Sequence, residues 1–263
     1  RWVWQALPVK AVARLLAAIL HAQGSVPVST MPGASRLLPA SVWMASRWTK
    51  HCCAAPPMPL LPMRSCLCRR QSLLPLRTAW RSGCTLAVVE LPDAGLAAVL
   101  PKMPVCAVTA VGPDGVSRSV ERLAALAGGV MRKESICVTA PEQPKAVLSE
   151  LVVAAGKCDC ELVVPDPEDI TFLEAEQFAS RVDYGGYTVP LAFLGRHAAG
   201  NAAMAVELAL ALCRKEVDIS DEAILDGIAA VDNRCSIRVL SQRPLVILDA
   251  CRTPQQLPRC CAC

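Results

Sequence analysis

A chain of 263 residues is long enough for one large domain or two small ones, and its 53% hydrophobic residues supply ample material for a core. The formal net charge of +4 is small and scattered, so nucleic acid is not expected as a partner. No apolar run approaches the roughly 20 residues that a membrane-spanning helix needs, so no membrane partner is expected either.

The chain begins at Arg1 without a methionine and carries no secretory signal, which favours a fragment of a cytoplasmic protein. Its 15 cysteines would indicate a disulfide framework in a small secreted protein, but this chain is too long and lacks that signal. The cysteines in apolar segments are therefore expected to be reduced and to pack as small hydrophobic residues.

Residues 10–23 predict an amphipathic helix that ends at Gly24. The residues that follow, 25–83, mix proline, cysteine, tryptophan and arginine without a sustained period of 2 or 3.6. This segment is therefore predicted to be irregular, and the regular part of the chain begins at Cys84.

From Cys84 onward, short β-branched runs alternate with helical segments. The expected strands are 85–91, 105–111, 136–140 and 160–164, and the expected helices are 120–131 and 144–156. This alternation predicts an α/β fold with a mostly parallel sheet flanked by helices.

A polar stretch, residues 166–186, leads into a long helix predicted over 198–214. A second helix, 221–230, has Ser220 as its N-cap and acidic residues in its first turn. The apolar strand 245–249 then opens a further domain shortly before the chain stops.

The irregular segment has an explanation in the genetic code. Tryptophan and methionine each have a single codon, so Trp43, Met44 and Trp48 constrain the bases around them. If this stretch is translated in a shifted reading frame, its codons permit the sequence D-G-E-P-V followed by a helix-like sequence. The same shift applied to the cysteine-rich tail gives A-A-A-L-L-R-V. We therefore hypothesise that residues 25–83 and the tail are out of frame.

The early cysteines have a second interpretation. His51, Cys52, Cys53, Cys66 and Cys68 could supply soft ligands for zinc. Adjacent cysteines and a C-x-C pair are poorer ligand spacings than C-x-x-C, which favours the out-of-frame interpretation.

A histidine and an asparagine stand at the start of the long predicted helix, in the sequence G-R-H-A-A-G-N-A. Gly195, His197, Asn201 and Ala202 match the pattern G-x-H-Q-x-x-N-A, with Ala198 in place of the glutamine. This pattern resembles that of the folylpolyglutamate/dihydrofolate synthase family, within the Mur ligase superfamily.

A second motif follows the last predicted strand. Asp249 and Pro254 match the same family's pattern D-x-A-H-N-P, whereas Cys251, Arg252 and Thr253 replace its alanine, histidine and asparagine. The scaffold is recognisable at both motifs, and part of the chemistry is substituted.

The resemblance implies roles for five residues. Lys10 would be a remnant of the phosphate-binding-loop lysine, although the glycines and serine of that loop are absent before it. Glu90 would be the acid that reaches magnesium. His197 would be catalytic, near the nucleotide and the reacting centre, and Asn201 and Asp249 would contact the nucleotide.

Four of these roles have plain structural alternatives. Lys10 could be a solvated lysine near the start of a helix. Glu90 could be an exposed carboxylate at the end of a strand, and His197 could be satisfied by local hydrogen bonds at a helix start. Asn201 could form a hydrogen bond between helices.

A second metal site of the family is lost from the sequence. Thr109, Gly112 and Asp114 match its surroundings, but Gly115 replaces a histidine ligand. Ala127 replaces a lysine, often carbamylated in the family, that helps to hold this metal.

The resemblance also implies four parts of the chain. They are a helix after a lost phosphate-binding loop (1–24), the out-of-frame segment (25–83), a Mur ligase-like central domain (84–235) and the truncated start of a Rossmann-like C-terminal domain (236–263). Intact members use ATP and Mg²⁺ to add glutamate to a folate or pteroate. This chain is predicted to be a degenerate, inactive and monomeric homologue, and the alternative is a non-catalytic binding or partner module.

Overall fold

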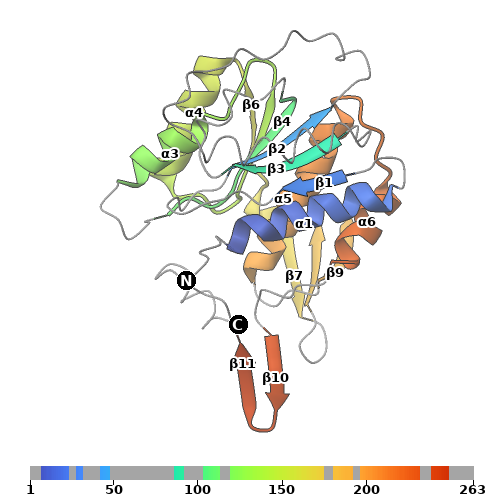
Figure 1. The fold of residues 1–263 in the computed structure, drawn as a ribbon. Coiled ribbons are helices and arrows are strands. Elements are labelled where there is room, and N and C mark those ends of the chain that lie inside the picture. The colour runs from blue at the N-terminus through green and yellow to red at the C-terminus, as the bar shows by residue number, and fades with distance from the viewer. Residues whose placement is uncertain are drawn as a thin grey trace, which may run out of the picture.

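The computed structural model describes nine ranges of the chain. They are residues 7–23, 28–31, 42–47, 86–91, 103–112, 119–174, 180–191, 196–231 and 238–248. The central feature is a six-stranded sheet in the order β1-β3-β2-β4-β5-β6 (Figure 1). Its strands are β1 (Val28–Met31), β2 (Val42–Arg47), β3 (Leu86–Leu91), β4 (Val105–Val108), β5 (Ile136–Thr139) and β6 (Glu161–Val163).

Most neighbouring strands of this sheet run in the same direction. β4, β5 and β6 are parallel to one another, and β1 is parallel to β3. β2 is antiparallel to both of its neighbours, β3 and β4. The predicted α/β fold with a mostly parallel sheet flanked by helices is confirmed.

The prediction that residues 25–83 are irregular is wrong for two short stretches. Val28–Met31 and Val42–Arg47 form strands β1 and β2. Both contain residues that favour extended backbone, such as valine, threonine and tryptophan, and pairing within a sheet satisfies their backbone hydrogen bonds. The rest of 25–83, including the zinc candidates His51 to Cys68, lies outside the described residues.

Strands β4 and β5 are buried on both faces, and their successive residues alternate between two apolar clusters. Val105 and Ala107 belong to the cluster that contains helix α1 (Leu7–Ala22) and helix α5 (Arg196–Cys213). Cys106 and Val108 belong to the cluster under α3 (Val120–Gly128) and α4 (Lys145–Cys158). Successive side chains of a strand point to opposite faces of the sheet, which explains this alternation. Helices cover both faces, so the molecule has three layers: helices, sheet and helices.

Two helices, α3 and α6, begin directly after a serine that caps them. Ser220 Oγ accepts a hydrogen bond of 3.2 Å from Ala223 N at the start of α6 (Asp221–Ala229), which confirms the predicted N-cap. Ser119 caps α3 in the same way, by accepting from Arg122 N at 3.3 Å. None of the described helices is long and apolar enough to cross a bilayer.

A three-stranded antiparallel sheet occupies much of the stretch that was predicted only as polar. After a 3₁₀ turn (η3, Pro167–Asp169) it is formed by β7 (Ile170–Glu174), β8 (Ser180–Tyr184) and β9 (Tyr187–Leu191). Gly185 and Gly186 connect β8 to β9 with φ values of 58° and 88°. Positive φ at both central residues is the requirement of a two-residue hairpin turn, and glycine meets it without strain.

Two tyrosines hold this small sheet against the helices. Tyr184 Oη donates a 2.6 Å hydrogen bond to Glu207 of α5, and Tyr187 Oη donates one of 2.6 Å to Asp221 of α6. The bond to Asp221 is the main cause that raises the pKa of Tyr187 to about 12. Both phenols therefore stay protonated donors near neutral pH.

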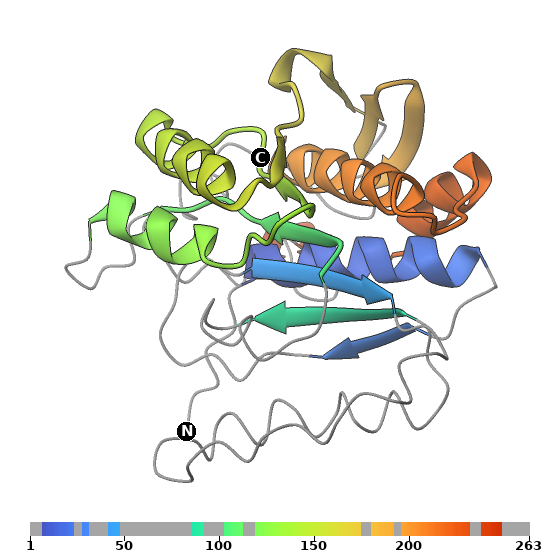
Figure 2. The same ribbon diagram turned by 90° about the horizontal axis from the view of Figure 1, so that it is seen from above.

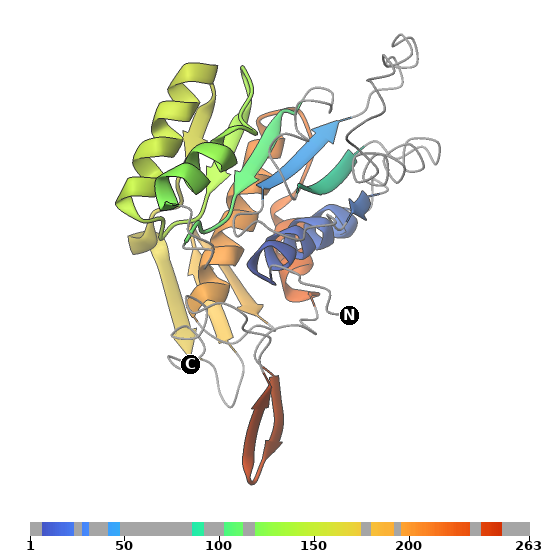
Figure 3. The same cartoon turned by 60° about the vertical axis from the view of Figure 1, so that its left-hand side comes forward.

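The last described elements form a separate hairpin. β10 (Arg238–Gln242) pairs antiparallel with β11 (Leu245–Leu248) and projects away from the main sheet (Figure 3). The predicted strand over 245–249 is confirmed as β11, while β10 was not predicted. The assignment of this region to a C-terminal domain stays a prediction.

Helices α1 and α6 approach each other so closely that only glycine fits between them. A Cβ placed on Gly227 of α6 would lie 2.3 Å from Cα of Ile19 in α1, which is far inside van der Waals contact. Ile19 belongs to the larger apolar cluster, and Gly227 is buried in α6. The backbones of the two helices would have to separate to admit any side chain here.

Replacing Gly227 by Ala should therefore destabilise the protein by about 1–3 kcal/mol, because an added methyl in a packed core forces a backbone shift. Gly156 of α4 is the matched control, since a Cβ there meets nothing within 4 Å. Gly156→Ala should stabilise by about 0.5–1 kcal/mol through the helix preference for alanine. Urea unfolding measures both, and equal effects of the two substitutions would contradict this packing.

Candidate functional site

The carboxyl ends of the parallel strands meet at one edge of the main sheet. Because β3 and β4 are both antiparallel to β2, they run in the same direction as each other. Val42 of β2 pairs with Leu91 and with Val108, and Val108 pairs with Thr139. The carboxyl ends of β3, β4 and β5 therefore lie side by side at the same edge of the sheet, which is the edge where open α/β sheets bind ligands.

Glu90 is the penultimate residue of β3 and lies at this carboxyl edge. Trp43 of β2 pairs with Glu90 on one side and with Ala107 on the other. The backbones of Glu90 and Ala107 are therefore two strand spacings apart, roughly 10 Å. The fold places Glu90 where the sequence predicted, with β2 between it and β4.

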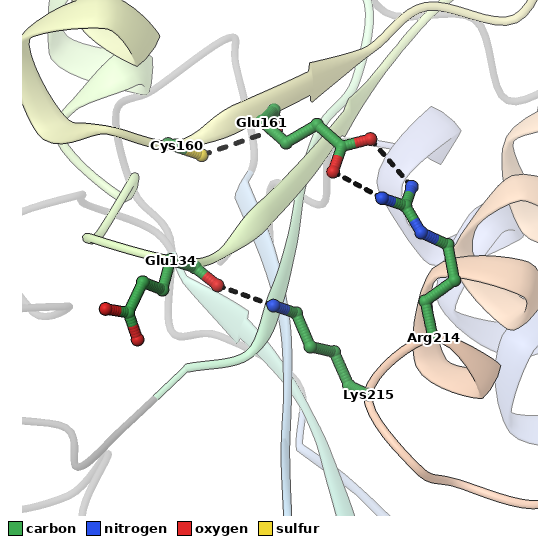
Figure 4. Close-up of polar contacts among 5 residues, drawn as sticks. All are labelled: Glu134, Cys160, Glu161, Arg214 and Lys215. Atoms are coloured by element: carbon green, nitrogen blue, oxygen red, sulfur yellow. Dashed lines mark hydrogen bonds and ion pairs between the residues drawn. The ribbon is translucent and has the colours of Figure 1, made fainter.

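Helix α5 is fastened at its C-terminal end to the opposite, amino edge of the sheet. Arg214 donates to both carboxylate oxygens of Glu161, at 2.7 and 2.5 Å, and Glu161 is the first residue of β6 (Figure 4). Lys215 Nζ donates a 2.6 Å hydrogen bond to the backbone oxygen of Glu134, just before β5. The helix therefore starts at the carboxyl edge.

The first two turns of α5 carry His197 and Asn201. These residues are four apart, so they lie on the same side of the helix, and both are partly buried. Gly200 stands between them, and a Cβ there would lie 3.2 Å from Cγ of Pro141 in the turn after β5. This close approach places the start of α5 beside the ends of the strands.

Lys10 lies in the first turn of α1, which lies beside α5 (Figure 2). The other end of α1 is near the amino edge, because Gln23 Oε1 accepts a 2.8 Å hydrogen bond from Ser220 N, close after the end of α5. A helix of 16 residues is about 24 Å long. The start of α1 therefore lies toward the carboxyl edge as well.

The structure thus brings the backbones of four predicted site residues to one edge. They are Lys10, Glu90, His197 and Asn201. Asp249, the fifth, lies outside the described residues. The chemical roles of all five stay predictions.

A polar network that the sequence reading did not single out lies at the same edge. Gln143 Nε2 donates to Thr109 O at 3.0 Å and to Thr139 Oγ1 at 2.9 Å, and Gln143 Oε1 accepts from Val111 N at 3.0 Å. Thr139 Oγ1 in turn donates to Val108 O at 3.1 Å. The signal available in the sequence was a threonine that ends a buried strand, followed by a polar residue in the next turn.

The position to which the sequence resemblance assigns a metal-holding lysine is apolar in the structure. Ala127 at this position is 3% exposed and packs in the apolar cluster under α3 and α4. Asp114 and Gly115 lie outside the described residues. Within the described ranges, no group of three or more histidine, cysteine, aspartate or glutamate side chains is arranged to hold a metal ion.

Three buried cysteines lie together beneath α3 and α4. Cys106 and Cys137 pair across β4 and β5, and Ser135 Oγ donates to Cys160 Sγ at 3.2 Å. Hydrogen bonding among the thiols, with burial, raises the pKa of Cys106 and of Cys160. Neutral buried thiols react poorly, which supports packing rather than redox chemistry for Cys160.

No family model and no curated protein matches the chain. Solved structures do match, and they define the class of fold as the α/β fold of the folylpolyglutamate synthases. The apo form of L. casei folylpolyglutamate synthase is 12% identical with a TM-score of 0.66, over 95% of this chain and 66% of that one.

Two further structures give the same result. A Mycobacterium tuberculosis folylpolyglutamate synthase complexed with ADP and AMPPCP is 15% identical with a TM-score of 0.67, over 97% of this chain and 64% of that one. A Yersinia pestis bifunctional folylpolyglutamate synthase/dihydrofolate synthase, complexed with AMPPNP and a Mn ion, is 19% identical with a TM-score of 0.63, over 95% and 61%. The chain has the fold of the folylpolyglutamate synthases and spans about two thirds of their length.

The ion pair of Glu161 should make stability depend on pH. The hydrogen bond from Arg214 lowers the pKa of Glu161 below its ordinary value of 4.5, so the ionised carboxylate stabilises the fold. This contribution is fully present above pH 4.5 and is lost as the pH falls through the lower pKa of the folded state. Glu161→Gln should therefore lower the thermal midpoint slightly near neutral pH and leave it unchanged in acid.

Glu134→Gln is the control for this comparison, because Lys215 bonds to the backbone oxygen of residue 134 and not to its carboxylate. Its midpoint should follow that of the wild type across the same pH range. A Glu161→Gln midpoint that stays below the wild type in strong acid would contradict the assignment.

The buried thiols should resist alkylation. Cys106, Cys137 and Cys160 should remain unmodified by iodoacetamide in the native protein at about pH 8 and react fully in urea, because the reagent needs an accessible thiolate. Mass spectrometry of the digested protein measures each site. Native modification of Cys106 at the rate of the denatured chain would contradict this packing.

Proposed function

We propose that this chain is a degenerate relative of the folylpolyglutamate/dihydrofolate synthases that has no ligase activity of its own. Its overall fold supports the relationship. The observation that carries the loss of activity is Ala127, whose methyl group is buried in an apolar cluster at the position of the family's metal-holding lysine. A methyl group can neither be carbamylated nor coordinate a metal.

Intact relatives activate a folate or pteroate carboxylate with ATP and then join it to the amine of glutamate. Such chemistry depends on magnesium and on positioned cations that stabilise the transferring phosphoryl group. The similar structures include a folylpolyglutamate synthase bound to AMPPCP and folate, and a Yersinia pestis enzyme bound to AMPPNP and a Mn ion. In this chain Lys10 lacks the glycine-rich loop that would bring backbone N–H groups to the phosphates.

The residues that remain at the carboxyl edge could still bind a ligand. In this proposal Lys10 meets the phosphates, Glu90 meets magnesium, and Asn201 and Asp249 contact the nucleotide beside His197. The alternative function, a non-catalytic binding or partner module, is supported by the apolar packing on both faces of β4 and β5. We propose a cytoplasmic monomer in either case.

The deciding experiment measures turnover and binding in one preparation. We expect no ADP release above background when the purified chain is given MgATP, dihydrofolate or dihydropteroate, and glutamate, and no glutamylated product by mass spectrometry. An intact folylpolyglutamate synthase assayed in parallel is the positive control. Glutamate-dependent turnover would overturn the proposal.

Calorimetry on the same sample separates the two candidate functions. Saturable binding of ATP or folate without turnover favours the binding module. In that case Lys10→Ala should weaken ATP binding roughly tenfold, the effect of losing one charge-assisted hydrogen bond. Lys157→Ala, which removes an exposed lysine from the last turn of α4, should leave binding unchanged.

A further inference from the structure

The segment that leaves β4 has the side chain of Gln143 as its hydrogen-bonding neighbour. The ladder between β4 and β5 ends at the pair Val108 and Thr139, followed by a 3.1 Å bond from Ala140 N to Val108 O. Beyond this point the backbone groups of Thr109 and Val111 bond to the side chain of Gln143.

These two backbone groups flank Ala110. In a parallel pair of strands, a residue on one strand bonds to two residues on the other. Its N–H donates to the carbonyl of the residue before its partner, and its carbonyl accepts from the N–H of the residue after its partner. Ile136 follows this rule at the start of the ladder, where its N–H donates to Pro104 O, the oxygen before its partner Val105. The carboxamide of Gln143 offers Ala110 the same donor and acceptor as a strand residue would.

These hydrogen bonds matter for stability because the groups that form them are buried. Val111 is fully buried, and Thr109 and Thr139 are at most 2% exposed. A buried N–H or carbonyl that loses its partner carries the full cost of desolvation, so the segment would have to change its path if the Gln143 amide were removed.

The turn that carries Gln143 also contacts the start of α5. Pro141, two residues before Gln143, is the group that a Cβ on Gly200 would approach at 3.2 Å. Gly200 lies between His197 and Asn201 on α5. The network therefore links the exit of β4, the turn after β5 and the helix that carries two candidate site residues.

We propose that the side-chain amide of Gln143 acts as a surrogate strand residue that positions Thr109–Val111 as one wall of the carboxyl-edge site. The part of this inference that concerns a ligand rests on the proposed function. Gln143 is a positioning residue, because it acts through the backbone of the segment after β4.

Hydrogen exchange tests the positioning directly. In Gln143→Ala the amide of Val111 should exchange roughly tenfold faster than in the wild type, because its only acceptor among the described residues is removed. Exchange in α6 should stay unchanged. Gln143→Glu keeps an oxygen that can accept from Val111 and should therefore retain more of the protection than the alanine variant.

Gln23→Ala is the matched control. It removes a glutamine whose side-chain oxygen also accepts from a backbone N–H, that of Ser220, but at the opposite edge of the sheet. It should speed exchange at Ser220 and leave Val111 unaffected. Unchanged exchange at Val111 in Gln143→Ala would overturn the inference, and so would an equal acceleration throughout the chain, which would indicate general destabilisation.

MgATP titration of the same variants separates the two proposals. Where the wild type binds, Gln143→Ala should weaken binding roughly tenfold while Gln23→Ala leaves it unchanged. Absence of binding by the wild type, with the exchange difference at Val111 present, would count against the proposed nucleotide site and support the positioning role. Equal binding by Gln143→Ala and the wild type would overturn the link between the segment and the ligand.

Discussion

The burial of helix α5 is the constraint on which the rest of the structure depends. Seven of its alanines are at most 2% exposed: Ala198, Ala199, Ala202, Ala203, Ala205, Ala209 and Ala211. A helix that is apolar over most of its circumference must be covered on most of its sides. Here the main sheet, α1, α6 and the sheet β7–β9 all contribute residues to the cluster around it, and the small alanine side chains let these elements approach closely.

This central helix also explains why the candidate site lies where it does. Its C-terminal end is held at the amino edge by Arg214 and Lys215, and its first turns meet the turn after β5 through Gly200. Because the helix is rigid and is anchored at both ends, its contacts at the amino edge of the sheet help to fix where its first turns lie at the carboxyl edge. His197 and Asn201 therefore depend on packing along the whole of α5, and not only on their immediate neighbours.

The sequence predicts the elements whose signal is local. Buried strands such as β4 and β5 read as short β-branched runs, and the α6 cap at Ser220 is visible three residues before its partner. The sheet β7–β9 was not predicted, because its outward-facing polar residues make the stretch look like a polar loop. Gly185-Gly186 between two tyrosines is nevertheless a turn signal.

The periodicity of the sequence does not predict which segments far apart in the chain pair with each other. The insertion of β2 between β3 and β4, and the bonds of Gln143 to the segment after β4, depend on which strands end level at one edge. For the same reason the motif at His197 could be recognised by its spacing, whereas its proximity to Pro141 could not.

The packing around Ala127 is consistent with the proposal that this chain keeps its fold without the site chemistry. Its helix α3 lies so close to α4 that a Cβ on the neighbouring Gly128 would come within 2.7 Å of Cβ of Ala154. A small apolar residue at 127 stabilises this contact layer, whereas an ammonium group there would have to leave water for an apolar cluster or displace α4. The packing therefore favours a small apolar residue at this position. A sheet of this kind needs only alternating apolar residues and closely packed helices, so the proposed loss of a metal-holding lysine does not require a change of fold.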